Sequence, residues 1–169
     1  MSLADLASLG SFVSGVAVAI TLIFLVIQMR QNTLAVRAAA SQALSSGYAE
    51  LSSITVTNGD MARIFRLGLS DLGQLNDDER VRFIGYVSIG LRFMESARLQ
   101  WRRGQLDKEH WQALEGDIKD IVAQPGVKAY WALRRHWHAE EFRQWLEALP
   151  QSETAPPLFG VSTTGGVGA

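Results

Sequence analysis

Three charged residues lie inside the most apolar stretch that follows the N-terminal region. Arg92, Glu95 and Arg98 are spaced three residues apart, and this spacing places neighbouring members side by side on a helix. Two interpretations stay open. The three side chains form either a partly buried charge network beside a polar cleft, where pKa values are perturbed, or an ordinary ion-pair ladder on an exposed helix edge.

Histidines are the next candidates, because His136, Trp137 and His138 are followed by two glutamates. On a helix, His136 and His138 point to nearly opposite sides. His136 and Glu140 have a suitable i, i+4 spacing, but two ligands do not make a zinc site, and the His-Glu-x-x-His pattern is absent. We therefore predict no metal and no cofactor, and we expect these histidines on the surface or in turns.

All five tryptophans lie in the C-terminal half of the chain. Such a set can line a ligand pocket or a partner groove, or it can fill the core of a small bundle. Helical spacing favours the core. The pocket alternative, a small-molecule sensor or enzyme, would be built from Arg92, Glu95 and the tryptophans, which are Trp101, Trp111, Trp131, Trp137 and Trp145.

The composition excludes several function classes. The chain has no cysteine, so thiolate catalysis and cysteine-based metal sites are excluded. A net charge of −1 gives no general attraction to nucleic acid. The sequence also lacks a Gly-rich phosphate loop, a Ser-x-x-Lys motif and a nucleophile elbow. Catalysis is therefore the less favoured interpretation.

The element that dominates the sequence is an uncharged apolar segment near the N-terminus. No charge occurs between Asp5 and Arg30, and a helix of about 20 apolar residues spans the hydrocarbon core of a bilayer. We predict one transmembrane helix over residues 6–29. The alternatives are a cleaved signal peptide, which would need a basic N-terminal region and a shorter apolar core, and a buried core helix.

Basic residues predict the orientation of this span. Arg30 and Arg37 follow it and no Lys or Arg precedes it. The positive-inside rule then places the N-terminus outside and the C-terminal domain in the cytoplasm. The expected location is the inner membrane of a bacterium, with the lipid bilayer as the first partner.

A stripe of small residues marks one face of the span, because Ser11, Gly15 and Ala19 recur every four residues. Such a stripe lets two helices approach closely, which would allow a homo-oligomer or contact with another membrane protein. The alternative is that small residues are simply common in membrane helices.

The remaining pattern is helical throughout and shows no strand signal. The span is expected to continue unbroken to Thr57, where Asn58-Gly59 breaks the helix. Asp60 is expected to cap a helix ending near Leu69. Further helices are expected over residues 77–103, 108–122, 127–137 and 139–149, with caps at Asn76 and Asp107 and a left-handed stop at Gly104.

The predicted fold is therefore all-α, with one N-terminal transmembrane helix that continues into a small helical bundle. The expected domains are a membrane anchor over residues 1–30, a bundle over 31–149 and a disordered tail over 150–169, which is rich in Pro, Ser, Thr and Gly. A weaker hypothesis places Arg102, Arg103, Arg134 and Arg135 against anionic lipid headgroups.

The chain resembles a widespread group of uncharacterised bacterial proteins with one N-terminal span and a helical soluble domain. The likeness covers roughly residues 1–149 and rests on residues 10–16 (GSFVSGV), 28–33 (QMRQNT), 61–68 (MARIFRLG), 102–107 (RRGQLD) and 124–126 (QPG) with Trp131. The resemblance implies the architecture and brings no catalytic residues. The leading hypothesis is a membrane-tethered helical interaction or accessory module.

Overall fold

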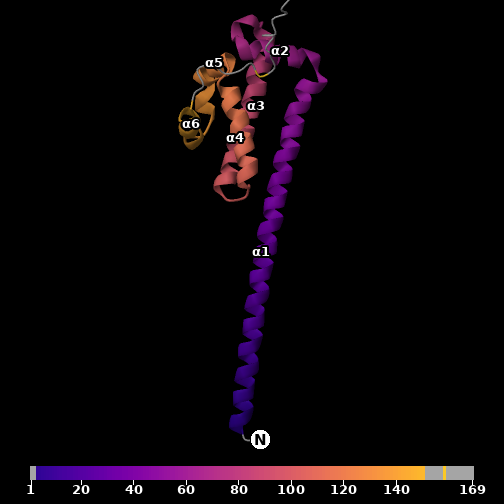
Figure 1. Ribbon diagram of the computed structural model, residues 1–169, viewed down its shortest axis with the longest axis vertical. Helices are drawn as coiled ribbons and strands as arrows, with labels where there is room; N and C mark the ends of the chain where they lie inside the picture. The colour runs from indigo at the N-terminus through magenta and orange to yellow at the C-terminus, as the bar shows by residue number, and fades with distance from the viewer. Residues whose placement is uncertain (1–2, 151–157, 159–169) are drawn as a thin grey trace, which may run out of the picture. The chain divides into compact units, whose positions relative to one another are not determined.

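The computed structural model describes residues 3–150 and residue 158, and all regular structure in that part of the chain is helical. Six α-helices and two short 3-10 helices follow one another without a strand in the described residues (Figure 1). The predicted all-α class is confirmed. The predicted disordered tail over 150–169 lies almost entirely outside the described residues. The chain divides into two compact units, residues 1–41 and 42–169.

The first helix, α1 (Leu3–Thr57), has 55 residues and is about 80 Å long at 1.5 Å per residue. No proline occurs before Pro125, so nothing interrupts its backbone hydrogen bonds. From Gly10 onward it is long and apolar enough to cross a membrane, with a mean hydropathy of 2.4 in its most apolar window. None of that window is buried inside the chain, so it is not a core helix. A signal sequence near the N-terminus can also satisfy this criterion of length and hydropathy.

The last four turns of α1 belong to the second unit. Leu44 is buried in a cluster with Ala97, Leu106 and Trp111, and the Leu51 carbonyl accepts a hydrogen bond of 3.1 Å from the Tyr86 hydroxyl. The helix that begins as an exposed apolar rod thus ends as a packed element of the bundle.

A short helix, α2 (Gly59–Ser70), follows the break at Asn58. The side chain of Asn58 accepts a hydrogen bond of 3.1 Å from the Met61 N–H, so Asn58 is the cap and the prediction of Asp60 was wrong. Asp60 instead lies in the first turn, where a carboxylate favours the helix dipole. The connection between this helix and the next contains a 3-10 turn, Leu72–Gln74.

The central helix of the second unit is α3 (Asp77–Arg102). The predicted capping box at its start is confirmed: Asn76 accepts from the Glu79 N–H at 2.9 Å and Glu79 accepts from the Asn76 N–H at 3.1 Å. Gly104 follows its end with φ +67°, as predicted for a left-handed stop. Buried residues run along its length, and they are Phe83, Val87, Ser88, Leu91, Met94 and Ala97.

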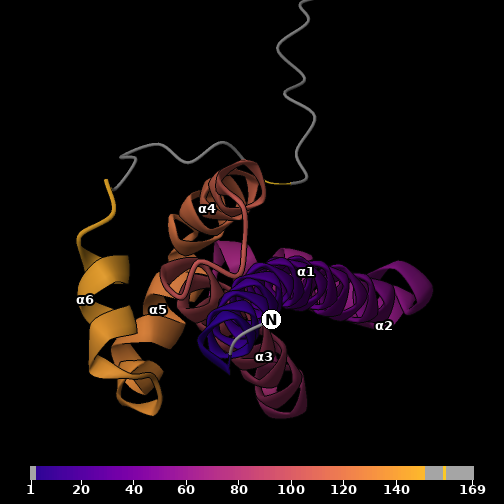
Figure 2. The same ribbon diagram turned by 90° about the horizontal axis from the view of Figure 1, so that it is seen from below.

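Three helices complete the unit: α4 (Lys108–Val122), α5 (Pro125–Arg134) and α6 (Glu140–Glu147). Figure 1 shows α4 lying alongside α3, and Figure 2 shows α5 and α6 next to each other. The predicted Asp107 cap of α4 is confirmed by a 2.9 Å bond from the His110 N–H, which is the largest cause lowering the pKa of Asp107.

The start of α5 differs from the prediction. We expected Pro125 to end one helix and Val127 to begin the next, but Pro125 is itself the first residue of α5. A proline fits there because its missing N–H would have no helical partner and its fixed φ suits a helix. The predicted helix over 127–137 is also divided, since Arg135–Trp137 form a 3-10 turn.

Helices α2 and α5 meet through two glycines. A Cβ added to Gly126 would stand 1.6 Å from the Gly68 carbonyl oxygen, and one added to Gly68 would stand 2.3 Å from the buried Phe83 ring. The backbones of α2 and α5 can approach this closely only because Gly126 lacks a side chain, and the Phe83 ring of α3 packs against Gly68 for the same reason.

An ion pair links α2 to the start of α3. Arg63 bonds to Glu79, and this bond is the largest of the causes that hold the pKa of Glu79 below its ordinary value of 4.5. Because the folded pKa is lowered, the carboxylate stabilises the fold above its unfolded pKa. That contribution is lost as pH falls through the lowered value.

Replacing Arg63 with Gln is expected to raise the pKa of Glu79 toward 4.5, because the neutral amide no longer favours the charged carboxylate. Carbon-13 NMR titration of the glutamate carboxyls, in the full chain in detergent micelles, measures this shift. Arg66→Gln is the control, since Arg66 is an exposed arginine on the same helix. An unchanged Glu79 titration in Arg63→Gln would contradict the assignment.

Candidate functional site

A pocket of about 370 Å³ opens beside the middle of α3. The sequence-predicted set of Arg92, Glu95 and Arg98 contributes to its wall. The remaining lining residues come from α3, from the turn after α5 and from the start of α6, and they are Ser96, Leu99, Trp137, Ala139, Glu141 and Phe142. The structure therefore brings the three charged residues together at one concave surface.

Glu95 bonds across the pocket to the connection before α6. Its Oε2 lies 2.9 Å from His138 Nδ1, and its Oε1 accepts a 2.8 Å hydrogen bond from the Ala139 N–H. Within residues 3–150, no ion pair joins Glu95 to Arg92 or Arg98, although all three share a helix. Both oxygens of this carboxylate are thus used to hold the start of α6.

His138 is the residue that sequence reasoning missed. It was expected on the surface or in a turn. It does lie in the turn before α6, but it is not on the surface, because its side chain is 0% exposed. Its Nδ1 carries the proton toward Glu95, because an ionised carboxylate only accepts. Its Nε2 lies 3.4 Å from the hydroxyl of the fully buried Tyr130. The outcome is a polar chain from α3 through His138 to α5.

One signal in the sequence points toward this chain. Glu95 is the only acidic residue of α3 beyond its first turn, and a carboxylate that is partly removed from water needs partners. The partner lies 43 residues later, however, and no local spacing connects the two.

Arg98 and Arg102 face α6. Arg98 Nε is 3.9 Å from Glu141 Oε1, Arg102 also pairs with Glu141, and the Arg98 guanidinium stands 4.4 Å above the Trp145 ring. Burial lowers the pKa of Arg98 from its ordinary value. A guanidinium with an ion pair and an aromatic face keeps its charge in a partly buried position.

Arg92 has a weaker attachment than Arg98. Its Nη2 donates to the Trp137 carbonyl at 3.5 Å, the outer limit of a hydrogen bond. Arg92 is exposed and Trp137 is half-exposed at the same pocket. Both side chains are therefore accessible to a ligand at the pocket wall.

The chemistry of this pocket is limited by how its groups are used. The carboxylate and the imidazole bond to each other, and the phenol of Tyr130 is buried. Among the described residues, no group of three or more His, Asp or Glu side chains could hold a metal ion. The arrangement can bind and orient a small polar molecule through Arg92, and it positions α6.

The tryptophans divide between core and surface. Trp101 stacks on Trp111 at 6.2 Å, and Trp111 contacts Trp145 at 5.5 Å. Trp111 is buried with Leu44 and Ala97, so this group fills the bundle core. Trp131 contacts His138 at 5.3 Å, and Trp137 alone of the five reaches the pocket wall.

The four arginines of the lipid hypothesis make separate contacts within the helical unit. Arg102 pairs with Glu141 and Arg135 with Glu147, while the Arg134 guanidinium lies 4.8 Å above the Trp137 ring. Arg103 caps the end of α3. Three of the four cations therefore have partners in the protein itself.

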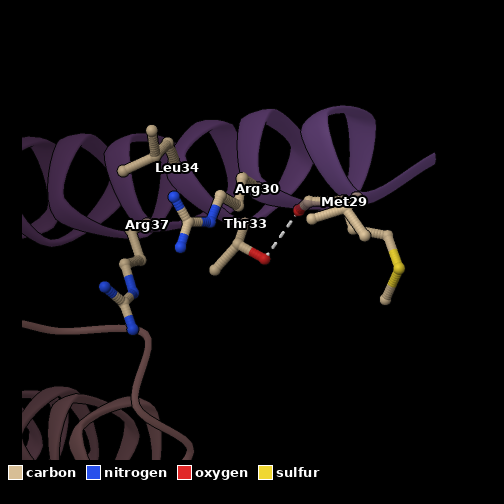
Figure 3. Close-up of a pocket in the computed structure, with 6 residues that line it drawn as sticks. Met29, Arg30, Thr33, Leu34 and Arg37 are labelled. Atoms are coloured by element: carbon tan, nitrogen blue, oxygen red, sulfur yellow. Dashed lines mark hydrogen bonds between the residues drawn. The ribbon is translucent and has the colours of Figure 1, made fainter. Parts of the chain in front are cut away.

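A second concave surface lies on α1, at the end of the apolar segment. It measures about 570 Å³ and is lined by Val26, Met29, Arg30, Thr33, Leu34 and Arg37 (Figure 3). Thr33 donates its hydroxyl to the Met29 carbonyl at 2.9 Å. The small-residue stripe, Ser11, Gly15 and Ala19, lies further toward the N-terminus, and all three residues are exposed.

Comparisons with protein families, with curated proteins and with solved structures find no match for this chain.

Proposed function

We propose that this protein is a single-pass membrane protein whose helical unit acts as an interaction or accessory module at the membrane surface. The observation that carries the proposal is the exposed, uncharged apolar surface of α1 before Arg30. Side chains such as Phe12, Ile23 and Phe24 lie well over half exposed. An apolar surface of this length is stable in hydrocarbon and costly in water.

The continuity of α1 supports an anchor over a cleaved signal sequence. A signal sequence has a basic start and a shorter apolar core, whereas the only charge before Arg30 is Asp5. Cleavage near Ala38–Ala40, where small residues resemble a cleavage site, would cut an unbroken helix between one and two turns before Leu44 enters the core. The same helix then serves as span and as bundle element.

The orientation that we propose places the helical unit in the cytoplasm of a bacterium. Arg30 and Arg37 are the only charges between Asp5 and Glu50, and basic residues beside a span are retained on the cytoplasmic side. An inverted protein would carry both arginines across the membrane.

The natural absence of cysteine makes this topology directly testable. Single cysteines introduced as Ser2→Cys and Lys108→Cys, in the full chain in bacterial spheroplasts, report the two sides of the membrane. A membrane-impermeant maleimide is expected to label Ser2→Cys in intact spheroplasts and Lys108→Cys only after permeabilisation. Extraction by alkaline carbonate would overturn the span, and the reverse labelling pattern would overturn the orientation.

We propose that the module self-associates through the small-residue stripe, so that its partner is another copy of this chain. Gly15→Leu is expected to lower the dimer fraction several-fold, because a large side chain separates two helix backbones that approach at a small residue. Crosslinking in native membranes, or energy transfer between labelled copies in vesicles, measures the dimer.

Gly10→Leu is the matched control for this test. Both glycines have open space around an added Cβ within the chain, so neither substitution clashes internally, and Gly10 lies well away from the stripe on the helix circumference. Equal dimer fractions in both variants and the unsubstituted protein would remove the stripe as a contact face.

A second candidate function is binding of a small acidic molecule in the pocket beside α3. The observation that favours it is Arg92, a weakly attached cation next to the half-exposed Trp137 in a pocket of about 370 Å³. Guanidinium groups bind carboxylates well. Thermal-shift measurement of the full chain against a set of small carboxylates, with Arg92→Gln as the comparison, tests it. Stabilisation that Arg92→Gln retains would reject this pocket.

A further inference from the structure

One side of α3 is exposed along most of the helix. Its members recur every three or four residues, a spacing that places them on the same side of a helix. All of them are exposed, and they are Val81, Gly85, Ile89, Arg92, Ser96 and Leu99. We call this row the open face of α3. Its three large apolar side chains, Val81, Ile89 and Leu99, are between 46% and 70% exposed, so the apolar row is in contact with water.

The open face is continuous with the pocket beside α3. Arg92, Ser96 and Leu99 belong to both, and Trp137 contributes to the pocket wall from the turn before α6. The Trp137 side chain is itself 43% exposed. The pocket of about 370 Å³ is therefore one part of a longer apolar surface that continues along α3 to Ile89.

The charge of this surface is positive, because its acidic groups are already bonded within the helical unit. Glu95 bonds to the start of α6, and Glu141 pairs with two arginines of α3. By contrast, Arg92 reaches the Trp137 carbonyl at 3.5 Å, and the Arg134 guanidinium lies 4.8 Å above the Trp137 ring. Within residues 3–150, no ion pair joins either arginine to a carboxylate.

Arg134 is the cation for which a carboxylate would matter most. The residue is half-buried, and its buried Nε makes no hydrogen bond within the described part of the chain. The C-terminal end of α5 favours a positive charge at this position. A charged group that is partly removed from water is stabilised further by an opposite charge and a hydrogen-bond acceptor.

From these observations we infer that the open face of α3, together with Trp137 and Arg134, is the docking surface for an acidic amphipathic helix of a partner protein. The inference rests on the proposed function, because it names the kind of partner that the interaction module binds. The apolar side of the partner helix packs on Ile89 and Leu99, and its carboxylates pair with Arg92 and Arg134. A second copy of this chain is less suitable, because it would bring its own Arg92 to the same positive surface.

The test places a photoreactive group on the open face in the full chain. Ile89→p-benzoylphenylalanine, produced in cells of the source organism, is irradiated in isolated native membranes. The expected product is a crosslink to another protein. Mass spectrometry of the crosslinked peptide is expected to identify a helical segment with apolar residues on one side and carboxylates beside them. A crosslink to a second copy of this chain, or to a segment without carboxylates, would overturn the inference.

A charge reversal tests the contribution of the arginine. Arg92→Glu, added to the photoreactive chain, is expected to lower the crosslink yield about tenfold, because like charges at an interface are unfavourable. Arg66→Glu is the matched control, since Arg66 is an exposed arginine of α2, and it is expected to keep the yield. Tryptophan emission of each purified variant confirms that it is folded. Equal yields in the two variants would overturn the role of charge in docking.

A second photoreactive position separates this inference from the proposed function. Val56, at the end of α1, is exposed and lies outside the open face of α3. A partner that crosslinks to Val56→p-benzoylphenylalanine but not to the Ile89 variant overturns the docking surface alone. No product from either position overturns the docking surface, and if the test of the small-residue stripe also finds no dimer, the interaction module is overturned with it.

Discussion

Gly126→Ala is expected to destabilise the helical unit by about 3 kcal/mol, the upper range for inserting atoms into a packed interior. The added Cβ would lie 1.6 Å from the Gly68 carbonyl oxygen and 2.8 Å from its carbonyl carbon. Neither atom can move aside by a rotamer change, since both belong to the backbone of α2. Relief requires α2 and α5 to separate, and their separation opens the core around the buried Ile64 and Tyr130.

Urea unfolding of the full chain in detergent micelles, followed by tryptophan fluorescence, measures this effect. All five tryptophans lie between residues 101 and 145, so the signal reports the helical unit and not the apolar segment of α1. Gly85→Ala is the matched control, because it lies in the interior of α3 with open space around an added Cβ. Gly85→Ala is expected to stabilise the helical unit by up to about 1 kcal/mol, because alanine has a higher helix propensity than glycine.

The two glycine substitutions are therefore expected to change the free energy of unfolding in opposite directions. A Gly126→Ala variant as stable as Gly85→Ala would show that α2 and α5 do not cross at Gly68. Gly68→Ala gives an independent check, since its Cβ would stand 2.3 Å from the fully buried ring of Phe83 and should also destabilise.

Local signals in the sequence were sufficient to predict most helix ends. The capping box at Asn76, the Asp107 cap and the left-handed Gly104 each depend on residues within a few positions of one another. Such signals act through short-range hydrogen bonds and backbone sterics. The failures were equally local: Asn58 caps α2 in place of Asp60, and Pro125 begins a helix that it was expected to precede.

The candidate pocket was only partly predictable. Periodicity placed Arg92, Glu95 and Arg98 on the same helix, but it did not show that Glu95 bonds to His138 and Ala139. That arrangement depends on how α6 packs against α3, which is determined by long-range contacts among apolar side chains such as Phe142 and Leu146. The pattern of two histidines followed by two glutamates led us to expect surface or turn histidines and no metal site. It did not show the bond from His138 to Glu95, because single-sequence patterns carry no distance information between helices.

Glu95→Ala is expected to lower the free energy of unfolding by about 3 kcal/mol, because it removes the acceptor of two hydrogen bonds at once. His138 Nδ1 is fully buried and the Ala139 N–H begins α6, and a buried donor without an acceptor carries a penalty of roughly 1–3 kcal/mol. Glu95→Gln should cost less, since its amide oxygen can still accept one of the two bonds. The urea experiment described for Gly126 measures both.

Glu115→Ala is the matched control for this charge. The Glu115 side chain is 27% exposed and the Glu95 side chain is 24% exposed. The two variants therefore lose carboxylates of similar accessibility. The partner of Glu115 is Lys119, one turn away at 3.4 Å, and such a surface pair contributes about 0.5 kcal/mol. Equal costs for the two variants would show that the bonds of Glu95 to the start of α6 contribute nothing beyond an ordinary surface charge.

The segment that loses stability in Glu95→Ala distinguishes anchoring of α6 from a general loss of stability. The side chain of Ala139, the N-cap residue of α6, accepts no hydrogen bond from the first turn, so the Glu95 carboxylate, which accepts from the Ala139 N–H, is the group that fixes where this helix begins. Removing it should free α6 before the rest of the unit unfolds, and amide hydrogen exchange in residues 140–147 should accelerate more than in α3 or α4. Because Glu141 and Phe142 of α6 also form the pocket wall with Arg92, any ligand held there would reverse the acceleration, which connects the stability of α6 to the occupancy of the pocket.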